Sequence, residues 1–259
     1  MFLSLPNTLL ISRINIAQCI KISYFEDDGD IYNAVTLIML TENCEILEVL
    51  RNEFGVSLTS ISWEAARDST KVLNYYLEKH ISVNTFLRNS SVPLQAAIES
   101  GSLERVQILH QRGKVNLAMP YPTDHGPNYA EFNGMPPLLH AVEIGSSPIV
   151  DYLLEAKVDC QSAGTYKKRN GITPVYLASE LGHLDILKSL VHHGADCKSA
   201  LTEGDDKGKT PLYAATNCRC QTSCEHLKIV EYLHSQDKKQ KTSAGLFQQV
   251  QVQQLQLHP

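Results

Sequence analysis

Residues 170–199 have the sequence NGITPVYLASELGHLDILKSLVHHGADCKS, and this stretch decides the fold. Pro174 suits the first turn of a helix, where the N–H that proline lacks would have no intrahelical partner, and Thr173 before it is a good N-cap. Gly182 breaks this helix, and Gly194 has the place of a left-handed residue that ends a second one. Between the two glycines, apolar residues recur at helical spacing, namely Leu184, Ile186, Leu187, Leu190 and Val191. The stretch therefore predicts one helix-turn-helix unit.

The opening phrase of this unit recurs along the chain. Each copy is followed by a polar stretch and a second apolar run, so the chain repeats a unit that cannot bury its apolar face alone. The four copies are VPLQAA at 92–97, PPLLHA at 136–141, TPVYLA at 173–178 and TPLYAA at 210–215. Function is therefore expected on a surface that is built by stacking.

These phrases resemble the ankyrin repeat family, whose signature is a Thr-Pro-Leu-His-x-Ala opening, a Gly-His turn and a Gly-Ala-Asp close. The resemblance implies an all-α fold, an α-solenoid of stacked ankyrin-type helix-turn-helix repeats with projecting β-turn or finger loops. The family's histidine at the fourth place of the opening phrase usually ties neighbouring turns together. Here that place holds other residues, namely Gln95, Leu139, Tyr176 and Tyr213. We therefore expect a softer array than is usual in the family.

The resemblance divides the chain into four parts. Residues 92–240 hold four repeats with loop insertions at 116–131 and 218–224, and residues 31–91 hold one or two degenerate copies, as is common at the end of an array. Residues 1–30 show no repeat and are expected to be irregular or capping. The glutamine-rich tail at 241–259 is expected to be disordered.

Composition favours a cytoplasmic protein, with the nucleus as an alternative. Apolar residues make up 43% of the chain, charged residues 20%, and the net charge is −5, which suits a sizeable core and does not favour nucleic-acid binding. No apolar run is long enough to span a bilayer, so we expect no membrane partner. We expect a monomer that binds a protein or peptide.

The repeat spacing shows where loops have been inserted. The prolines of the four opening phrases are separated by 44, 37 and 37 residues, against about 33 in the family. The largest insertion, at 116–131, contains three prolines and the candidate contact residues Tyr121, His125 and Tyr129. Loops on one face of a solenoid are common binding elements, although a tolerated insertion explains the length equally well.

The family pattern also places partner-binding residues at the end of each first helix. Stacking would align the pairs Glu99 and Ser100, Glu143 and Ile144, and Glu180 and Leu181, which predicts an acidic row beside a partly apolar one. Such a row favours a partner segment with basic and apolar residues. Alternatively, glutamate is present simply because it is a good exposed helix former. Lys167, Lys168 and Arg169 add a basic finger that could also contact the partner.

A cysteine-rich insertion in the last repeat offers a different chemistry. Cys218, Cys220, Cys224 and His226 could supply thiolate and imidazole ligands to a tetrahedral zinc ion. The spacing is not that of common zinc fingers, and three cysteines in a loop could also be idle or oxidisable. We expect no cofactor, with zinc as the one alternative.

The sequence shows no convincing catalytic motif. The segment from Gly204 to Thr210, GDDKGKT, resembles a phosphate-binding loop but is one residue short, and its two aspartates would repel phosphate. No nucleophile or acid–base arrangement is evident, so we expect no enzyme.

The favoured function is a protein–protein interaction module, a scaffold or adaptor. The alternatives are a metal- or redox-responsive protein and a substrate-receptor subunit of a complex such as a ubiquitin ligase.

Overall fold

The structure is a computed structural model of the 259-residue chain, and it describes residues 44, 47, 48, 52, 69–79, 93–122, 132–217 and 225–236. The chain divides into two compact units, Met1–Asn116 with Tyr121–Asn133, and Leu117–Pro120 with Gly134–Pro259. The expectations for residues 1–30 and 241–259 lie outside the described residues. None of the described helices is long and apolar enough to cross a membrane.

The first unit contains the helices α5 (Thr70–Glu78), α6 (Pro93–Glu99) and α7 (Leu103–Gln111). Ser69 caps α5 by accepting a hydrogen bond from the Val72 N–H at 3.3 Å, as expected for a hydroxyl at an N-cap. α6 packs on α7, and α7 packs on α5. The core between them is apolar and includes Val72, Leu73, Tyr76, Leu94, Ile98, Val106 and Leu109, all buried.

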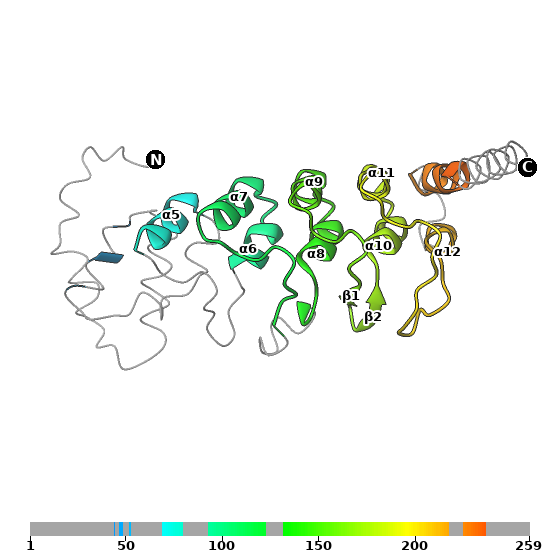
Figure 1. Ribbon diagram of the computed structural model, residues 1–259, viewed down its shortest axis with the longest axis horizontal. Helices are drawn as coiled ribbons and strands as arrows, with labels where there is room; N and C mark the ends of the chain where they lie inside the picture. The colour runs from blue at the N-terminus through cyan, green and yellow to red at the C-terminus, as the bar shows by residue number, and fades with distance from the viewer. Residues whose placement is uncertain are drawn as a thin grey trace, which may run out of the picture. The chain divides into compact units, whose positions relative to one another are not determined.

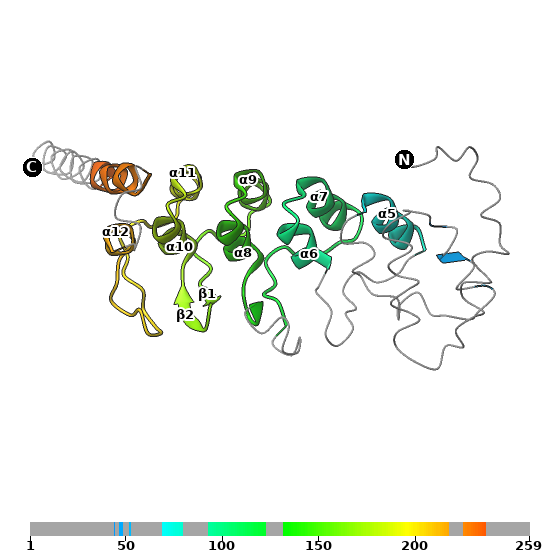
Figure 2. The same ribbon diagram turned by 180° about the vertical axis from the view of Figure 1, so that it is seen from behind.

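The second unit repeats one helix pair along its length. Its elements are α8 (Pro137–Ile144), α9 (Ser147–Glu155), β1 (Gly164–Tyr166), β2 (Arg169–Ile172), α10 (Pro174–Leu181), α11 (Leu184–His192), α12 (Pro211–Thr216) and a helix at 225–236. The first helices of each pair, α8, α10 and α12, lie in one layer (Figure 1). We call this the inner layer. The second layer consists of α9, α11 and the 225–236 helix. The loops extend from the inner layer in the direction away from this second layer (Figure 2).

The predicted caps set the ends of the inner helices. The Thr173 and Thr210 hydroxyls accept hydrogen bonds from backbone N–H groups three residues on, at 3.3 and 3.2 Å. Each is followed by a proline at the first helical position, where its missing N–H costs nothing. Gly145 and Gly182 end α8 and α10 with φ of 76° and 83°, in the left-handed region that glycine adopts without strain.

Stacking buries the apolar faces that the repeated phrases contribute. Leu138 and Leu139 on α8, and Leu177 on α10, have no exposed surface at all. In the second layer Ile149, Leu153, Leu187 and Leu190 are equally buried. Each such side chain stabilises the fold by about 1.5–3 kcal/mol relative to exposure to water, so the core of this unit lies between the two layers and between successive pairs.

Histidines connect neighbouring turns, but they do not stand at the fourth place of the opening phrase, where the family usually has them. The His183 ring makes a hydrogen bond to the Glu143 backbone in the preceding turn. The His226 Nε2 atom lies 3.1 Å from the carbonyl oxygen of Glu180, so the same tie occurs one repeat later. His183 directly precedes α11, and His226 lies in the first turn of the 225–236 helix. Neighbouring turns are therefore hydrogen-bonded to each other even though the opening phrases lack the family's histidine.

Replacing Gly182 with alanine should break one of these ties. A Cβ at this position would lie 2.8 Å from the Cε1 atom of His226, and the backbone φ of +83° is strained for any L side chain. We expect the free energy of unfolding to fall by about 2 kcal/mol in urea denaturation, from backbone strain and the displaced ring together. Gly208→Ala is the control, because Gly208 has a φ of +85° and no atom within 4 Å of its Cβ position. Equal losses in the two variants would show that the histidine contact adds nothing.

Candidate binding surface

The predicted contact residues of the second unit occupy equivalent places on neighbouring inner helices. Glu143 and Ile144 end α8, and Glu180 and Leu181 end α10. Ile144 is 43% exposed, and it is one of the large apolar side chains that the described residues leave open to solvent. α8 and α10 pack against each other, so these two pairs lie on one face of the unit.

A two-stranded hairpin stands beside this face. β1 and β2 are antiparallel, and a two-residue turn made of Lys167 and Lys168 joins them. Both lysines have a left-handed backbone, with φ of 46° and 68°. Tight hairpins favour such turns because their twist matches that of the strands. The base of the hairpin is fixed, since a Cβ on Gly164 would lie 2.1 Å from the Cδ atom of Pro136.

The next finger, residues 196–210, packs directly on this hairpin. A Cβ on Gly204 would lie 2.1 Å from the Asn170 carbonyl oxygen, and one on Gly171 would lie 2.7 Å from the Glu203 Cγ atom. Only glycine permits two backbones to approach so closely. The glycine-containing segment that resembles a phosphate-binding loop thus serves to stack one finger on the next. We call the two stacked fingers, residues 159–173 and 196–210, the finger ledge.

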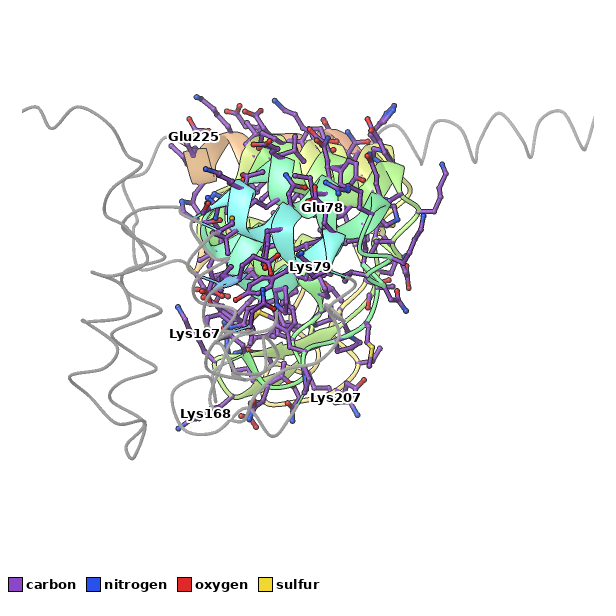
Figure 3. The ribbon with its side chains drawn as sticks, turned by 90° about the vertical axis from the view of Figure 1, so that its left-hand side faces the viewer. Glu78, Lys79, Lys167, Lys168, Lys207 and Glu225 are labelled. Atoms are coloured by element: carbon purple, nitrogen blue, oxygen red, sulfur yellow. The ribbon has the colours of Figure 1, made fainter. Side chains whose placement is uncertain are left out.

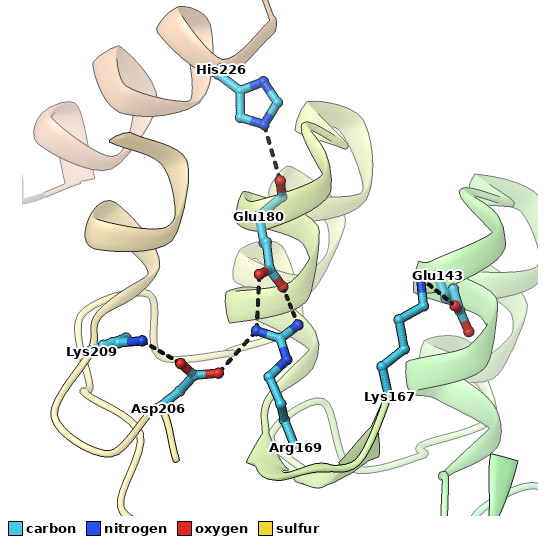
Figure 4. A network of polar contacts seen from close by, with 7 residues as sticks. All are labelled: Glu143, Lys167, Arg169, Glu180, Asp206, Lys209 and His226. Atoms are coloured by element: carbon cyan, nitrogen blue, oxygen red, sulfur yellow. Dashed lines mark hydrogen bonds and ion pairs between the residues drawn. The ribbon is translucent and has the colours of Figure 1, made fainter. Parts of the chain in front are cut away.

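Arg169 connects the finger ledge to the inner layer (Figure 4). Its Nη1 and Nη2 atoms donate to the two carboxylate oxygens of Glu180 at 2.9 and 2.7 Å. The Nη1 atom also donates to Asp206 at 2.9 Å, and Lys209 pairs with the other oxygen of that carboxylate. The Asp206 side chain is only 8% exposed. This four-residue network joins the hairpin, α10 and the following finger.

Glu143 has a looser partner on the same hairpin. The Lys167 Nζ atom lies 3.6 Å from its carboxylate and 4.9 Å from the centre of the Tyr166 ring. At Glu143 and Glu180 the acidic row is not open, because Lys167 and Arg169 from the hairpin already pair with the two carboxylates. The contact of these residues with a partner stays a prediction. The sequence showed these basic residues, but it did not show that they fold back onto the inner helices.

Comparison with known families agrees with this architecture. A family model described as ankyrin repeats (3 copies) matches residues 113–200 and 158–243, which together cover half of the chain. The chain belongs to the ankyrin repeat family. No curated protein is similar enough to this chain to add a nearer relative. The predicted recognition and the predicted helical solenoid fold are both confirmed. Ankyrin repeats are generally protein–protein interaction modules and are typically not enzymes.

Electrostatics keep the network of this ankyrin array charged. Hydrogen bonds from Lys209 and from Arg169 hold the pKa of the Asp206 carboxyl below its ordinary value. The pKa of the Arg169 guanidinium is raised, chiefly by its hydrogen bonds to Glu180. Burial raises the pKa of Tyr166, which lies beneath Lys167 and Arg169 with ring-centre distances of 4.9 and 5.2 Å. Asp206 and Arg169 therefore remain ionised near neutral pH, and the Tyr166 hydroxyl stays neutral.

Contact residues predicted in the first unit have different surroundings. Glu99 accepts a hydrogen bond from the Gln95 Nε2 atom at 3.0 Å, and Ser100 accepts one from Arg105 at 3.1 Å. Tyr121 is only 3% exposed, and its pKa is raised well above the ordinary value by burial and then by nearby Glu99. Tyr121, a predicted contact residue, therefore has almost no surface to offer a partner. His125 and Tyr129 lie outside the described residues.

The candidate metal ligands are described only at His226. Its ring is buried against Gly182, and its Nε2 atom faces the Glu180 carbonyl oxygen at 3.1 Å. Cys218, Cys220 and Cys224 lie outside the described residues, and within the described ones no group of three or more histidine, cysteine or acidic residues could hold a metal ion. The zinc site stays a prediction, and His226 already has a structural role in the ankyrin array.

Proposed function

We propose that this chain is a non-catalytic scaffold or adaptor that binds a segment of a partner protein on one face of its second unit. The face consists of the ends of α8 and α10 and the adjoining finger ledge. The observation that carries the proposal is Ile144, a large apolar side chain that is 43% exposed beside fixed charged residues. A single exposed apolar side chain is ordinary by itself, but one that is held beside charged residues in fixed positions can serve as an anchor for a partner.

The rigidity of the surroundings supports the same proposal. Glycine contacts at Gly164 and Gly204 fix the fingers, and the Arg169 network fixes them to α10. A surface that is already ordered loses little conformational entropy on binding, so more of the contact energy appears as affinity.

We further propose that the protein is monomeric and cytoplasmic or nuclear. Cys160 is a free cysteine, which suits a reducing compartment.

Replacing Ile144 with arginine tests the proposal. Partners captured by cross-linking to the full chain would be identified and then titrated directly against purified variants. We expect Ile144→Arg to weaken binding about tenfold or more, because a desolvated apolar anchor is replaced by a charge. Leu227→Arg is the matched control, since Leu227 is 65% exposed on the second-layer helix. Partners that bind both variants as tightly as the unchanged chain would contradict the proposed face.

A further inference from the structure

The hairpin between β1 and β2 has one basic side chain, Lys168, that no ion pair among the described residues neutralises. The carboxylates at the ends of α8 and α10 are paired within the chain, Glu143 with Lys167 and Glu180 with Arg169. Asp206 in the neighbouring finger is paired as well. Lys168 is exposed and enters none of the ion pairs among the described residues. Figure 3 shows the Lys168 side chain extending outward from the finger end of the molecule.

The backbone at this turn is unusual for lysine. Lys167 and Lys168 both have positive φ, at the two positions where a tight hairpin normally has Asn-Gly or Gly-Gly. A side chain in this region strains the backbone, and such strain is often found at functional sites. The turn therefore gives up local stability at the place where it presents two ammonium groups.

One lysine of the turn reaches the end of α8, the helix that ends at the exposed Ile144. Lys167 is 60% exposed and reaches the carboxylate of Glu143, the residue that directly precedes Ile144. The outer side of Lys167 remains open to solvent because its single carboxylate contact, at 3.6 Å, is loose. Lys167 thus lies near the end of α8 that carries Ile144, and Lys168 extends outward from the same turn.

We infer that the partner segment is acidic, with a carboxylate that meets Lys168 and the outer side of Lys167 next to an apolar residue that covers Ile144. This inference rests on the proposed function and adds the chemistry of the partner. A basic segment fits less well, because it would have to displace Lys167 from Glu143 or Arg169 from its two-point contact with Glu180. Charge complementarity of this kind sets the orientation of the partner and raises its association rate.

A random peptide library displayed on phage and selected against the full chain tests the inference. We expect the selected peptides to be enriched in aspartate and glutamate next to an apolar residue. Synthetic peptides made from the selected sequences should bind the Lys168→Glu variant about three- to tenfold more weakly at low salt. The difference should shrink toward about 0.5 M salt, where charges are screened within a few ångström.

A pair of glycine variants separates the charge from any effect on folding. Lys168→Gly removes the ammonium group and the backbone strain together, so it should raise the midpoint of thermal unfolding by about 1–2 °C while weakening peptide binding. Lys157→Gly is the control, because Lys157 also has a left-handed backbone, with φ of 66°, but follows the second-layer helix α9. It should be stabilised similarly and bind the peptides normally.

The outcomes distinguish the inference from the proposed function. Peptides enriched in lysine or arginine, or acidic peptides that bind Lys168→Glu normally, would overturn the inference. If the peptides of either class bind the Ile144→Arg variant more weakly than the unchanged chain, the proposed face stands with a different partner chemistry. If the selected peptides are indifferent to both substitutions, or if no peptide is selected, the proposed function fails as well.

Discussion

Replacing Arg169 with methionine is expected to lower the free energy of unfolding by about 2–3 kcal/mol, because it removes one partner of a largely buried ion-pair network. Asp206, only 8% exposed, would keep Lys209 alone, and Glu180, 28% exposed, would lose its two-point contact. Methionine retains most of the aliphatic volume of the side chain, so lost packing contributes little. Urea denaturation of the purified full chain measures the change.

The neighbouring residue provides the control for this variant. Lys168→Met removes the same unit of charge one position away, but Lys168 is exposed and enters none of the ion pairs among the described residues. Its effect on stability should stay within about 0.5 kcal/mol. Similar losses in the two variants would mean that the Arg169 network is no more important than a surface charge, which would also weaken the case for a rigid finger ledge.

Mild acid should destabilise the protein through His140. This side chain is fully buried on α8, and burial lowers the pKa of its imidazole from 6.5 to about 4. The unfolded chain therefore takes up a proton near pH 6.5, and the folded chain does so only near pH 4. Between these values the unfolded state binds more protons, so stability falls as the pH falls. From this residue alone we expect a loss of about 2.5 kcal/mol on going from neutral pH to about pH 4.5.

A variant that lacks only the histidine at position 140 isolates this contribution. His140→Leu keeps an apolar side chain in the same space and cannot be protonated, so its unfolding free energy should depend less on pH over this interval. His183 should continue to contribute in the same direction, because burial lowers its pKa as well. The measurement is a series of urea denaturations of both proteins at several pH values. Identical pH dependence in the two proteins would contradict the assignment to His140.

Much of the architecture was predictable because ankyrin repeats are specified locally. Thr173 and Thr210 cap helices through hydroxyls that bond to N–H groups three residues on, and Gly145 and Gly182 end helices with a left-handed backbone. Each of these interactions joins residues that are close in the sequence. The same locality explains why the opening phrases fix where the inner helices begin.

The candidate surface was predictable only in part, because its character depends on contacts between repeats. The equivalent places of Glu143 and Glu180 follow from the repeat pattern. Their pairing with Lys167 and Arg169 requires the hairpin to fold back onto α8 and α10, and the pairing of Arg169 with Asp206 spans 37 residues. Tyr121 shows the same limit, since nothing in its proline-rich segment indicated that the ring would be buried.

Arg169 takes its partners from two successive repeats, and this arrangement couples the charge of the surface to the integrity of the array. Repeat proteins open locally, one unit at a time. When the repeat that begins at Pro211 frays, the finger that carries Asp206 departs and Arg169 keeps Glu180 alone. The three basic residues of the hairpin, Lys167, Lys168 and Arg169, then have one carboxylate fewer to pair with. We therefore expect a partly unfolded molecule to bind anionic surfaces more strongly than an intact one, so that a loss of stability brings a loss of selectivity.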